Sequence, residues 1–431
     1  MRESFTIQRI KQYVLLHRGI LIDLLLIAVI GTLAISWFRG DFLILYGDFD
    51  FYPEWHDTFF RTFYSWDVEG MAVPNTQVLV ALMPYEVFRT FTLGFLGLSP
   101  VVAEKILFYL CFTMSGLSMY YLVRVTSEKR RLVGLVAAFS YMFNPYNVIF
   151  TWGGAITYTI FFYASFPLIL ALFIKGLNER RGFKYIFFFC LLWMVTTNSS
   201  YVNPKWMALT WLILGAYLIF YILTHRIRQN ILPSLRFSGV LFASWVVLNL
   251  YWLIPNFYAL GTELRATFAI YKATGTTDIL APWLSGSLPS IGDAMRLSGF
   301  WGLYSGVGGD PFYNWAASYS SPLLIFISFL MPVLAFFSLA TRARNKYVIF
   351  FTLVALFIIF QLKGPNPPLG DITRWFYTNI PLVRDIGISP FANLSPALTL
   401  SYSFLIGHGI DSLYHLVVNG KETGIVSSSA E

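Results

Sequence analysis

Apolar runs of about 20 residues recur along the whole chain, and they constrain the fold more than any other feature of the sequence. A run of this length lets an α-helix cross the hydrocarbon core of a bilayer. Charged residues make up only 12% of the chain, against roughly 25% in an average soluble protein. A membrane β-barrel would show alternating segments of about ten residues instead, and the sequence lacks them. We therefore predict an all-α, polytopic bundle of transmembrane helices.

The runs define about ten spans, whose ends are uncertain by a few residues. We place them at residues 19–38, 101–123, 132–150, 158–176, 184–198, 206–224, 237–256, 321–341, 347–362 and 395–417. The first run is long and no small-residue cleavage site follows it, so it is typical of a signal anchor and not of a cleaved signal peptide. The fifth run is short and could be re-entrant.

Basic residues fall in short clusters between the spans, and this pattern predicts the orientation. The net charge of +8 could indicate nucleic-acid binding, but clusters that alternate with apolar runs are the orientation signal of a membrane protein. The clusters precede the first span and join later pairs, as in "RVTSEKRR" (124–131) and "TRARNK" (341–346). We predict that these gaps face the cytoplasm, with both termini, and that nucleic acid is not a partner.

The other gaps are acidic or aromatic, and three of them are long: 39–100, 257–320 and 363–394. We predict that they lie on the extracytoplasmic face of a cell membrane and contain short helices. Residues 1–417 then form one membrane domain, and the polar stretch 418–431 forms a cytoplasmic tail that we expect to be disordered.

Two groups of residues exclude some kinds of chemistry. Cys111 and Cys190 both lie inside apolar runs, so a disulfide framework or a thiolate metal site is not expected. Ionisable residues are scarce within the spans, and the exceptions sit near span ends, where we expect water to reach them. These exceptions are Asp23, Glu104, His408 and Asp411. Proton-coupled transport therefore has little support.

Acidic residues gather directly after the first span, in "LYGDFDFYPEWHDTFFRTFYSWD" (45–67). The five carboxylates are Asp48, Asp50, Glu54, Asp57 and Asp67. The Asp48-x-Asp50 spacing suits a hard divalent cation, or a general base oriented by its neighbour. The alternative is a solvated loop, in which Asp57 caps a helix that begins at "TFFRTF".

The outer loops carry further helical and aromatic patterns. Segments 57–66 and 76–92 have apolar residues at helical spacing, so they could lie along the membrane interface or pack as small helices on the membrane domain. The loops also hold Trp55, Trp66, Trp283, Trp301, Tyr304, Tyr313, Trp315 and Tyr319. These rings could line a groove for sugars or form the aromatic belt of a membrane protein.

Scattered stretches over nearly the whole chain resemble polytopic glycosyltransferases of the C-type (GT-C) fold. In particular they resemble the membrane domain of the mycobacterial α-(1→3)-arabinofuranosyltransferase family. The stretches are "GDFDFYPEWHDTFFRTFYSWD" (47–67), "NTQVLVALMP" (75–84), "AAFSYMFNPYNV" (137–148), "NSSYVNPKW" (198–206), "LNLYWLIPNFY" (248–258) and "RDIGISPFANLSPALTLSYSFLIGHGI" (384–410). Members of that family are much longer, and their arginine-proline-lysine pattern before the last span survives here only as Arg384 and Pro390.

The resemblance implies an enzyme that takes a sugar from a polyprenyl-phosphate donor in the membrane. It implies Asp48 as the general base, with Asp50 orienting it or helping to bind Mg²⁺ or Mn²⁺. The leaving phosphate needs cations, and Arg384 is the first candidate and Lys205 the second. The alternative for each is a side chain that extends to lipid headgroups. Gln77 and His56 are further candidates for donor binding.

The leading hypothesis is thus a membrane glycosyltransferase that acts on an extracytoplasmic glycan, lipid or glycoprotein. A transporter or flippase for lipid-linked saccharides would have a similar aromatic and basic outer surface. A non-catalytic protein of envelope assembly is the third possibility. The acidic cluster separates them, because only the transferase requires Asp48 for turnover.

Overall fold

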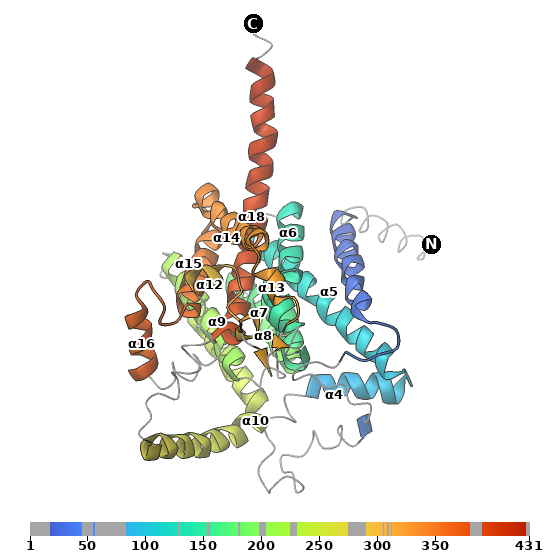
Figure 1. Cartoon of the computed structure of the whole chain (residues 1–431), viewed down its shortest axis with the longest axis vertical. Helices are drawn as coiled ribbons and strands as arrows, with labels where there is room; N and C mark the ends of the chain where they lie inside the picture. Colours follow the sequence, from blue (N-terminus) through green and yellow to red (C-terminus); the bar gives the residue numbers. More distant parts are fainter. Residues whose placement is uncertain are drawn as a thin grey trace.

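The structure of the chain is a computed structural model, and it is a bundle of α-helices (Figure 1). It describes residues 18–44, 55–56, 83–127, 130–152, 156–179, 182–197, 204–224, 231–274, 290–304, 306–307, 310–311, 313–379 and 390–427. Seven helices in these segments are long and apolar enough to cross a membrane. The all-α membrane architecture predicted from the sequence is confirmed.

The predicted spans correspond to ten helical segments. The seven long ones are Arg18–Trp37, which ends in the 3-10 helix η1 (Thr32–Trp37), α5 (Pro100–Thr126), α6 (Arg131–Met142) with the π-helix η3 (Asn147–Thr151), α7 (Ile156–Asn178), α9 (Pro204–Thr224), α10 (Ile231–Thr274) and α14 (Pro322–Arg342). Two shorter apolar ones are α8 (Phe183–Leu192) with η4 (Trp193–Thr197), and α15 (Lys346–Leu362). The tenth is α18 (Pro390–Ser427).

Smaller elements connect these helices. They are α4 (Met83–Arg89), η2 (Thr90–Phe95), α12 (Ile291–Met295), η7 (Trp301–Leu303), α13 (Ala316–Tyr319) and α16 (Gly370–Asn379). A minimal antiparallel hairpin joins β1 (Gly306–Val307) to β2 (Asp310–Pro311), with Gly306 opposite Pro311. Helix α4, which falls within the predicted helical segment 76–92, lies across the axis of the bundle (Figure 1).

Two helices are longer than the sequence predicted. Helix α10 continues to Thr274 although we ended its span at 256, and α18 continues to Ser427 although we placed a disordered tail after 417. In both cases the apolar pattern fades before the helix ends. A helix that is already nucleated extends at little cost through residues such as Lys421 and Glu422.

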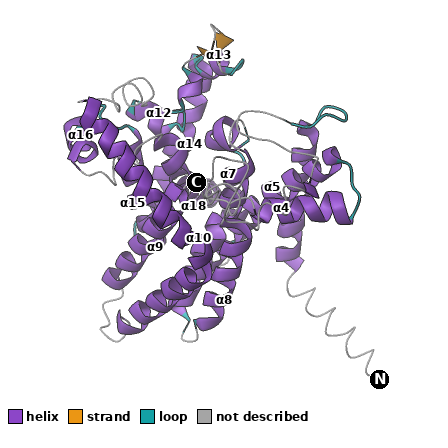
Figure 2. Cartoon of the chain, turned by 90° about the horizontal axis from the view of Figure 1, so that it is seen from below, coloured by secondary structure: helices purple, strands orange, loops and turns teal. Residues whose placement is uncertain are grey.

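Helix α18 is the centre of the bundle. Its residues from Phe391 to Ile406 are almost all buried, and it packs against α6, α14 and α15. Seen along the axis, the other helices surround it (Figure 2). A second, smaller hydrophobic core joins the first span to α4 and α5, with Ile27, Tyr85 and Phe108 among its members.

The two ends of the bundle differ in their chemistry. We call the end that holds Arg130, Arg131 and Arg342 the basic end, and α18 projects from the bundle at this end (Figure 1). We call the opposite end, where α5 and α18 begin, the loop end. At the loop end Ser99 caps α5 by accepting a hydrogen bond from the Val102 N–H (3.4 Å), and Pro100 stands in the first turn.

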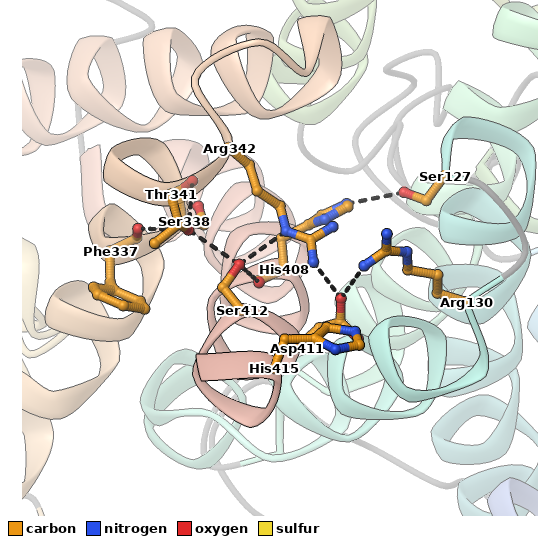
Figure 3. Close-up of polar contacts among 10 residues, drawn as sticks. All are labelled: Ser127, Arg130, Phe337, Ser338, Thr341, Arg342, His408, Asp411, Ser412 and His415. Atoms are coloured by element: carbon orange, nitrogen blue, oxygen red, sulfur yellow. Dashed lines mark hydrogen bonds and ion pairs between the residues drawn. The ribbon is translucent and has the colours of Figure 1, made fainter. Parts of the chain in front are cut away.

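A polar network ties three helices together at the basic end (Figure 3). Asp411 on α18 accepts hydrogen bonds from Arg130 (2.7 Å) and from Arg342 at the end of α14. Ser412 accepts from the Nε of Arg342 (2.8 Å), and His408 Nε2 lies 2.9 Å from the Ser127 hydroxyl. These contacts fix the end of α14 and the start of α6 to the same turn of α18.

The prediction that water reaches the ionisable residues near span ends is wrong. Asp23, Glu104, His408 and Asp411 are each at most 4% exposed. Asp23 accepts hydrogen bonds from Nε and Nη2 of Arg131 and one from the Tyr120 hydroxyl (2.7 Å). Their partners come from parts of the chain that are far away in the sequence, so proximity to a span end did not reveal their burial.

Candidate functional site

The first outer loop leaves the bundle at a fixed point beside the start of α5. The Ile44 N–H donates a hydrogen bond to Glu104 Oε2 (3.0 Å). Lys105 Nζ donates to the Gly40 carbonyl (3.4 Å) and lies 5.7 Å from the centre of the Phe38 ring. The first turns of α5 therefore hold the chain just before Asp48 and Asp50, which both lie outside the described residues.

Helix α4, in the last part of the first outer loop, contains a buried ion pair. Arg89 Nη2 lies 2.6 Å from Glu86 Oε2, and the two residues are 0% and 3% exposed. The Arg89 guanidinium also lies over the Tyr85 ring, 5.6 Å from its centre. Burial raises the pKa of Tyr85 well above its usual value, and the positive charge of Arg89 opposes that shift. This turn of α4 is thus a dense polar layer inside the second core.

The opposite side of α4 and η2 opens into an apolar groove. The groove has a volume of about 580 Å³, and its lining residues are Trp55, Val87, Thr90, Phe91, Gly94 and Phe95. Phe91 and Phe95 stack on each other with ring centres 5.5 Å apart, and both are more than half exposed. The groove is wide open to its surroundings. Its apolar lining favours a hydrocarbon ligand.

Gly94 allows the groove to form. A Cβ atom at this position would lie 2.8 Å from the Trp55 ring, which is closer than van der Waals contact permits. Because Gly94 has no side chain, the Trp55 ring can pack directly against η2. The neighbouring residue His56 is exposed, with its ring centre 5.5 Å from that of Trp55.

A second set of contacts joins the starts of α9 and α18. The Ala392 carbonyl accepts hydrogen bonds from Trp206 Nε1 (3.0 Å) and from the Tyr146 hydroxyl (3.2 Å). Lys205 is half-buried, directly before Trp206. Helix α4 contacts η4, which leads toward Lys205 along the chain. Helix α4 and η4 are thus neighbours at the loop end.

The segment 290–319 packs over the start of α18. The Phe300 ring lies 5.8 Å from Phe391 and 5.6 Å from Phe150, measured between centres. The hydroxyl of Tyr313 donates a hydrogen bond to the Ile149 carbonyl. Buried Arg296 holds the base of the segment, because its Nε donates to Ser328 Oγ on α14 (2.6 Å).

A buried lysine, Lys363, also lies at the loop end. Lys363 is 0% exposed, and its Nζ donates to the carbonyls of Asn366 (2.8 Å) and Gly364 (3.2 Å). Burial lowers the pKa of Lys363 below its usual value. Backbone carbonyls solvate the ammonium group here, and no ion pair to Lys363 occurs among the described residues.

The structure locates two of the predicted site residues. His56 lies beside the apolar groove, and Lys205 lies at the start of α9. Asp48, Asp50, Gln77 and Arg384 lie outside the described residues, so their roles stay predictions. Within the described segments no cluster of three or more His, Cys, Asp or Glu residues could hold a metal ion. Use of Mg²⁺ or Mn²⁺ through Asp48 and Asp50 is therefore untested.

Sequence reasoning missed several residues at this end. It singled out Glu104 but treated it as water-exposed, and it did not identify the Glu86–Arg89 pair. The i, i+4 spacing of Phe91 and Phe95 was the available signal for the groove. Of the outer-loop aromatic residues, Trp55 lines the groove, whereas Tyr313 is buried and stacks on Trp315 with ring centres 4.8 Å apart.

The fold is similar to that of a solved membrane glycosyltransferase. The arabinofuranosyltransferase AftD from mycobacteria, determined by single-particle cryo-electron microscopy, superposes with a TM-score of 0.59 and 13% sequence identity. The match covers 90% of this chain and 24% of AftD, so the chain spans about a quarter of the length of that protein. No protein-family model matches the chain, and the sequence of no curated protein matches it. The likeness shows that the chain shares its fold with the matched part of AftD.

Proposed function

We propose that the chain is a membrane glycosyltransferase that transfers a sugar from a polyprenyl-phosphate donor to a glycan, lipid or glycoprotein acceptor. In this proposal the loop end faces the extracytoplasmic side of a cell membrane, and both termini face the cytoplasm. The alternation of basic and acidic gaps along the sequence supports this orientation.

The apolar groove at the loop end is the observation that carries the proposal. It lies beside His56 and on α4 and η2, the two short helices in the last part of the first outer loop. A transferase with a lipid-linked donor must hold a hydrocarbon chain next to a polar reaction centre. The groove on α4 and η2 offers the apolar surface that such a hydrocarbon chain needs.

The proposed chemistry is displacement at the anomeric carbon of the donor. Asp48 takes the proton of the acceptor hydroxyl as that oxygen attacks, and Asp50 orients Asp48 or shares a divalent ion with it. The bond between the sugar and the phosphate breaks, and the polyprenyl phosphate leaves as an anion. Lys205 and Arg384 are the cations that we assign to this charge, because fixed positive groups stabilise a leaving phosphate.

A transfer assay in proteoliposomes tests the proposal. The protein is reconstituted with a set of polyprenyl-phosphate sugars and candidate acceptors, and the product of Asp48→Asn is compared with that of the wild type. We expect Asp48→Asn to lose transfer by about 100-fold or more while donor binding is retained. Asn keeps the shape of the side chain but cannot accept the proton.

Two results would contradict the proposal. Equal product from the two proteins would remove Asp48 from the mechanism. Movement of the lipid-linked sugar between leaflets, with no transfer and with equal rates in both proteins, would identify a flippase instead. Asp371→Asn, at an exposed position of α16, serves as the control for a lost carboxylate at the loop end.

A further inference from the structure

Glu104 is a buried acid whose surroundings give it little compensation. The residue is 0% exposed, and its Oε2 accepts one hydrogen bond, from the Ile44 N–H (3.0 Å). Within the described part of the chain, Oε1 has no hydrogen-bond partner, and Glu104 forms no ion pair. Asp23 and Asp411, the other two acids buried near span ends, both face arginines. A carboxyl group held in this way opposes stability, because burial removes its hydration.

The Ile44 contact explains why such a group could be present. Segment 38–44 connects the first span to the first outer loop, and α5 holds it at three places. Phe38 packs on Phe108 with ring centres 5.2 Å apart, and the Lys105 ammonium group lies 3.4 Å from the Gly40 carbonyl oxygen. The bond from Ile44 to Glu104 is the last of the three along the chain, and it is the shorter of the two hydrogen bonds.

This last contact is the closest described contact of segment 38–44 to the acidic cluster along the sequence. Asp48 follows Ile44 by four residues, and four extended residues span at most about 14 Å. The entry of the loop is therefore tethered near the carboxyl group of Glu104, whatever path the following residues take. A tether of this kind reduces the conformations from which Asp48 must reach a reactive position.

We propose that Glu104 is a positioning residue that anchors the first outer loop through the Ile44 N–H and so places Asp48 for catalysis. The inference rests on the proposed transferase function for its kinetic consequence, but the anchoring itself can be measured without activity. Glu104 acts as a hydrogen-bond acceptor and exchanges no proton with the substrate. The amide oxygen of a glutamine can accept the same bond, whereas methionine keeps the length and shape of the side chain but removes the acceptor.

A spin label on segment 38–44 tests the anchoring directly. Phe42 is 77% exposed, and the two native cysteines are buried, so a nitroxide attached to Phe42→Cys reports selectively on this segment. We expect the label mobility of Glu104→Gln to match that of the parent protein and that of Glu104→Met to increase. Lys105→Gln, which alters a longer and exposed contact in the same turn of α5, is the matched control and should change the mobility less.

Transfer kinetics and thermal unfolding test the consequence. We expect Glu104→Gln to keep kcat within about threefold and Glu104→Met to lower it by about 10- to 100-fold, because small displacements of catalytic groups have effects of this size. The KM for the donor should stay within about threefold in both, since Glu104 contacts no substrate. The melting temperature of Glu104→Met should equal or exceed that of the wild type, since an isolated buried carboxyl group is removed.

Each contrary outcome overturns a distinct part of the inference. Equal label mobility in Glu104→Met and the parent protein overturns the anchoring. Loss of transfer in Glu104→Gln with unchanged mobility overturns the positioning role, because the carboxyl group would then act directly. A lower melting temperature together with a lower kcat in Glu104→Met would mean that Glu104 is only a structural residue. Glu104→Leu, whose side chain has a different shape, repeats this test. If the wild type transfers no sugar, the proposed function fails while the label still decides whether Glu104 anchors the loop.

Discussion

Buried charges are compensated by different groups at the two ends of the bundle. At the basic end, Asp411 faces Arg130 and Arg342, and Asp23 faces Arg131, so each buried acid is neutralised by arginine. At the loop end, Glu104 faces one backbone N–H, and Lys363 faces two backbone carbonyls and the Phe360 ring. The loop end also has the apolar groove.

This difference distinguishes the residues that hold the helices together from those that we propose to act in the reaction. Breaking a compensated buried pair is costly, so the basic-end network stabilises the contacts among α6, α14 and α18. Buried charges that are only partly compensated reduce stability, and strained or costly groups tend to be kept where a protein acts. Among the described residues of the loop end, the Glu86–Arg89 and Asp293–Arg296 pairs are exceptions, and the two members of each pair lie three residues apart in the chain. The comparison therefore supports the proposal that the functional region lies at the loop end.

The largest effect on stability is expected from Asp411→Asn. The substitution keeps the size of the side chain but removes the charge shared by two arginines, and breaking a buried pair costs about 3–5 kcal/mol. Because Arg130 is 40% exposed, we expect about 2–3 kcal/mol, measured as a lower melting temperature in detergent. Arg344→Gln, at an exposed position of the same end, is the control. An unchanged melting temperature would mean that the network does not hold the bundle together.

A smaller effect, on donor affinity, is expected from Gly94→Ala. The added Cβ would lie 2.8 Å from the Trp55 ring, so the ring must move and the groove changes shape. Loss of about 1 kcal/mol of apolar contact corresponds to a KM for the donor that is roughly fivefold higher. Gly239→Ala on α10 has nothing within 4 Å of the added atom and should behave like the wild type. Equal donor KM in both variants would separate the groove from donor binding.

The smallest effect is expected from Lys363→Met. Burial lowers the pKa of Lys363 from its usual value of 10.5, so between the lowered pKa and 10.5 the unfolded chain binds more protons than the folded protein. Stability of the wild type should therefore rise with pH across that window, and the rise should be absent in Lys363→Met. At neutral pH the variant should lie within about 1 kcal/mol of the wild type. Thermal unfolding from pH 7 to pH 10.5 checks both expectations. The same pH dependence in Lys363→Met and in the wild type would contradict the assignment of the lowered pKa to Lys363.

The sequence predicted the membrane helices well and the functional end only in outline. Spans are readable because about 20 apolar residues in succession suffice to define each one. Buried charges were misjudged because their partners are remote, as Asp411 is from Arg130 and Glu104 from Ile44. The groove could not be predicted because it forms only when Trp55 packs on Gly94, a contact between separate segments. The extensions of α10 and α18 were missed because hydropathy stops marking a helix once it becomes polar.

Photo-crosslinking is the most direct test of the claim that the loop end binds the lipid carrier. A polyprenyl-phosphate sugar with a photoreactive group in its hydrocarbon chain is incorporated into proteoliposomes, and the labelled peptides are identified by mass spectrometry. We predict labelling of residues 83–95, competed by unmodified donor and reduced in Gly94→Ala. Labelling that excess phospholipid removes equally well, or labelling concentrated at the basic end near Arg130 and Arg342, would contradict the account.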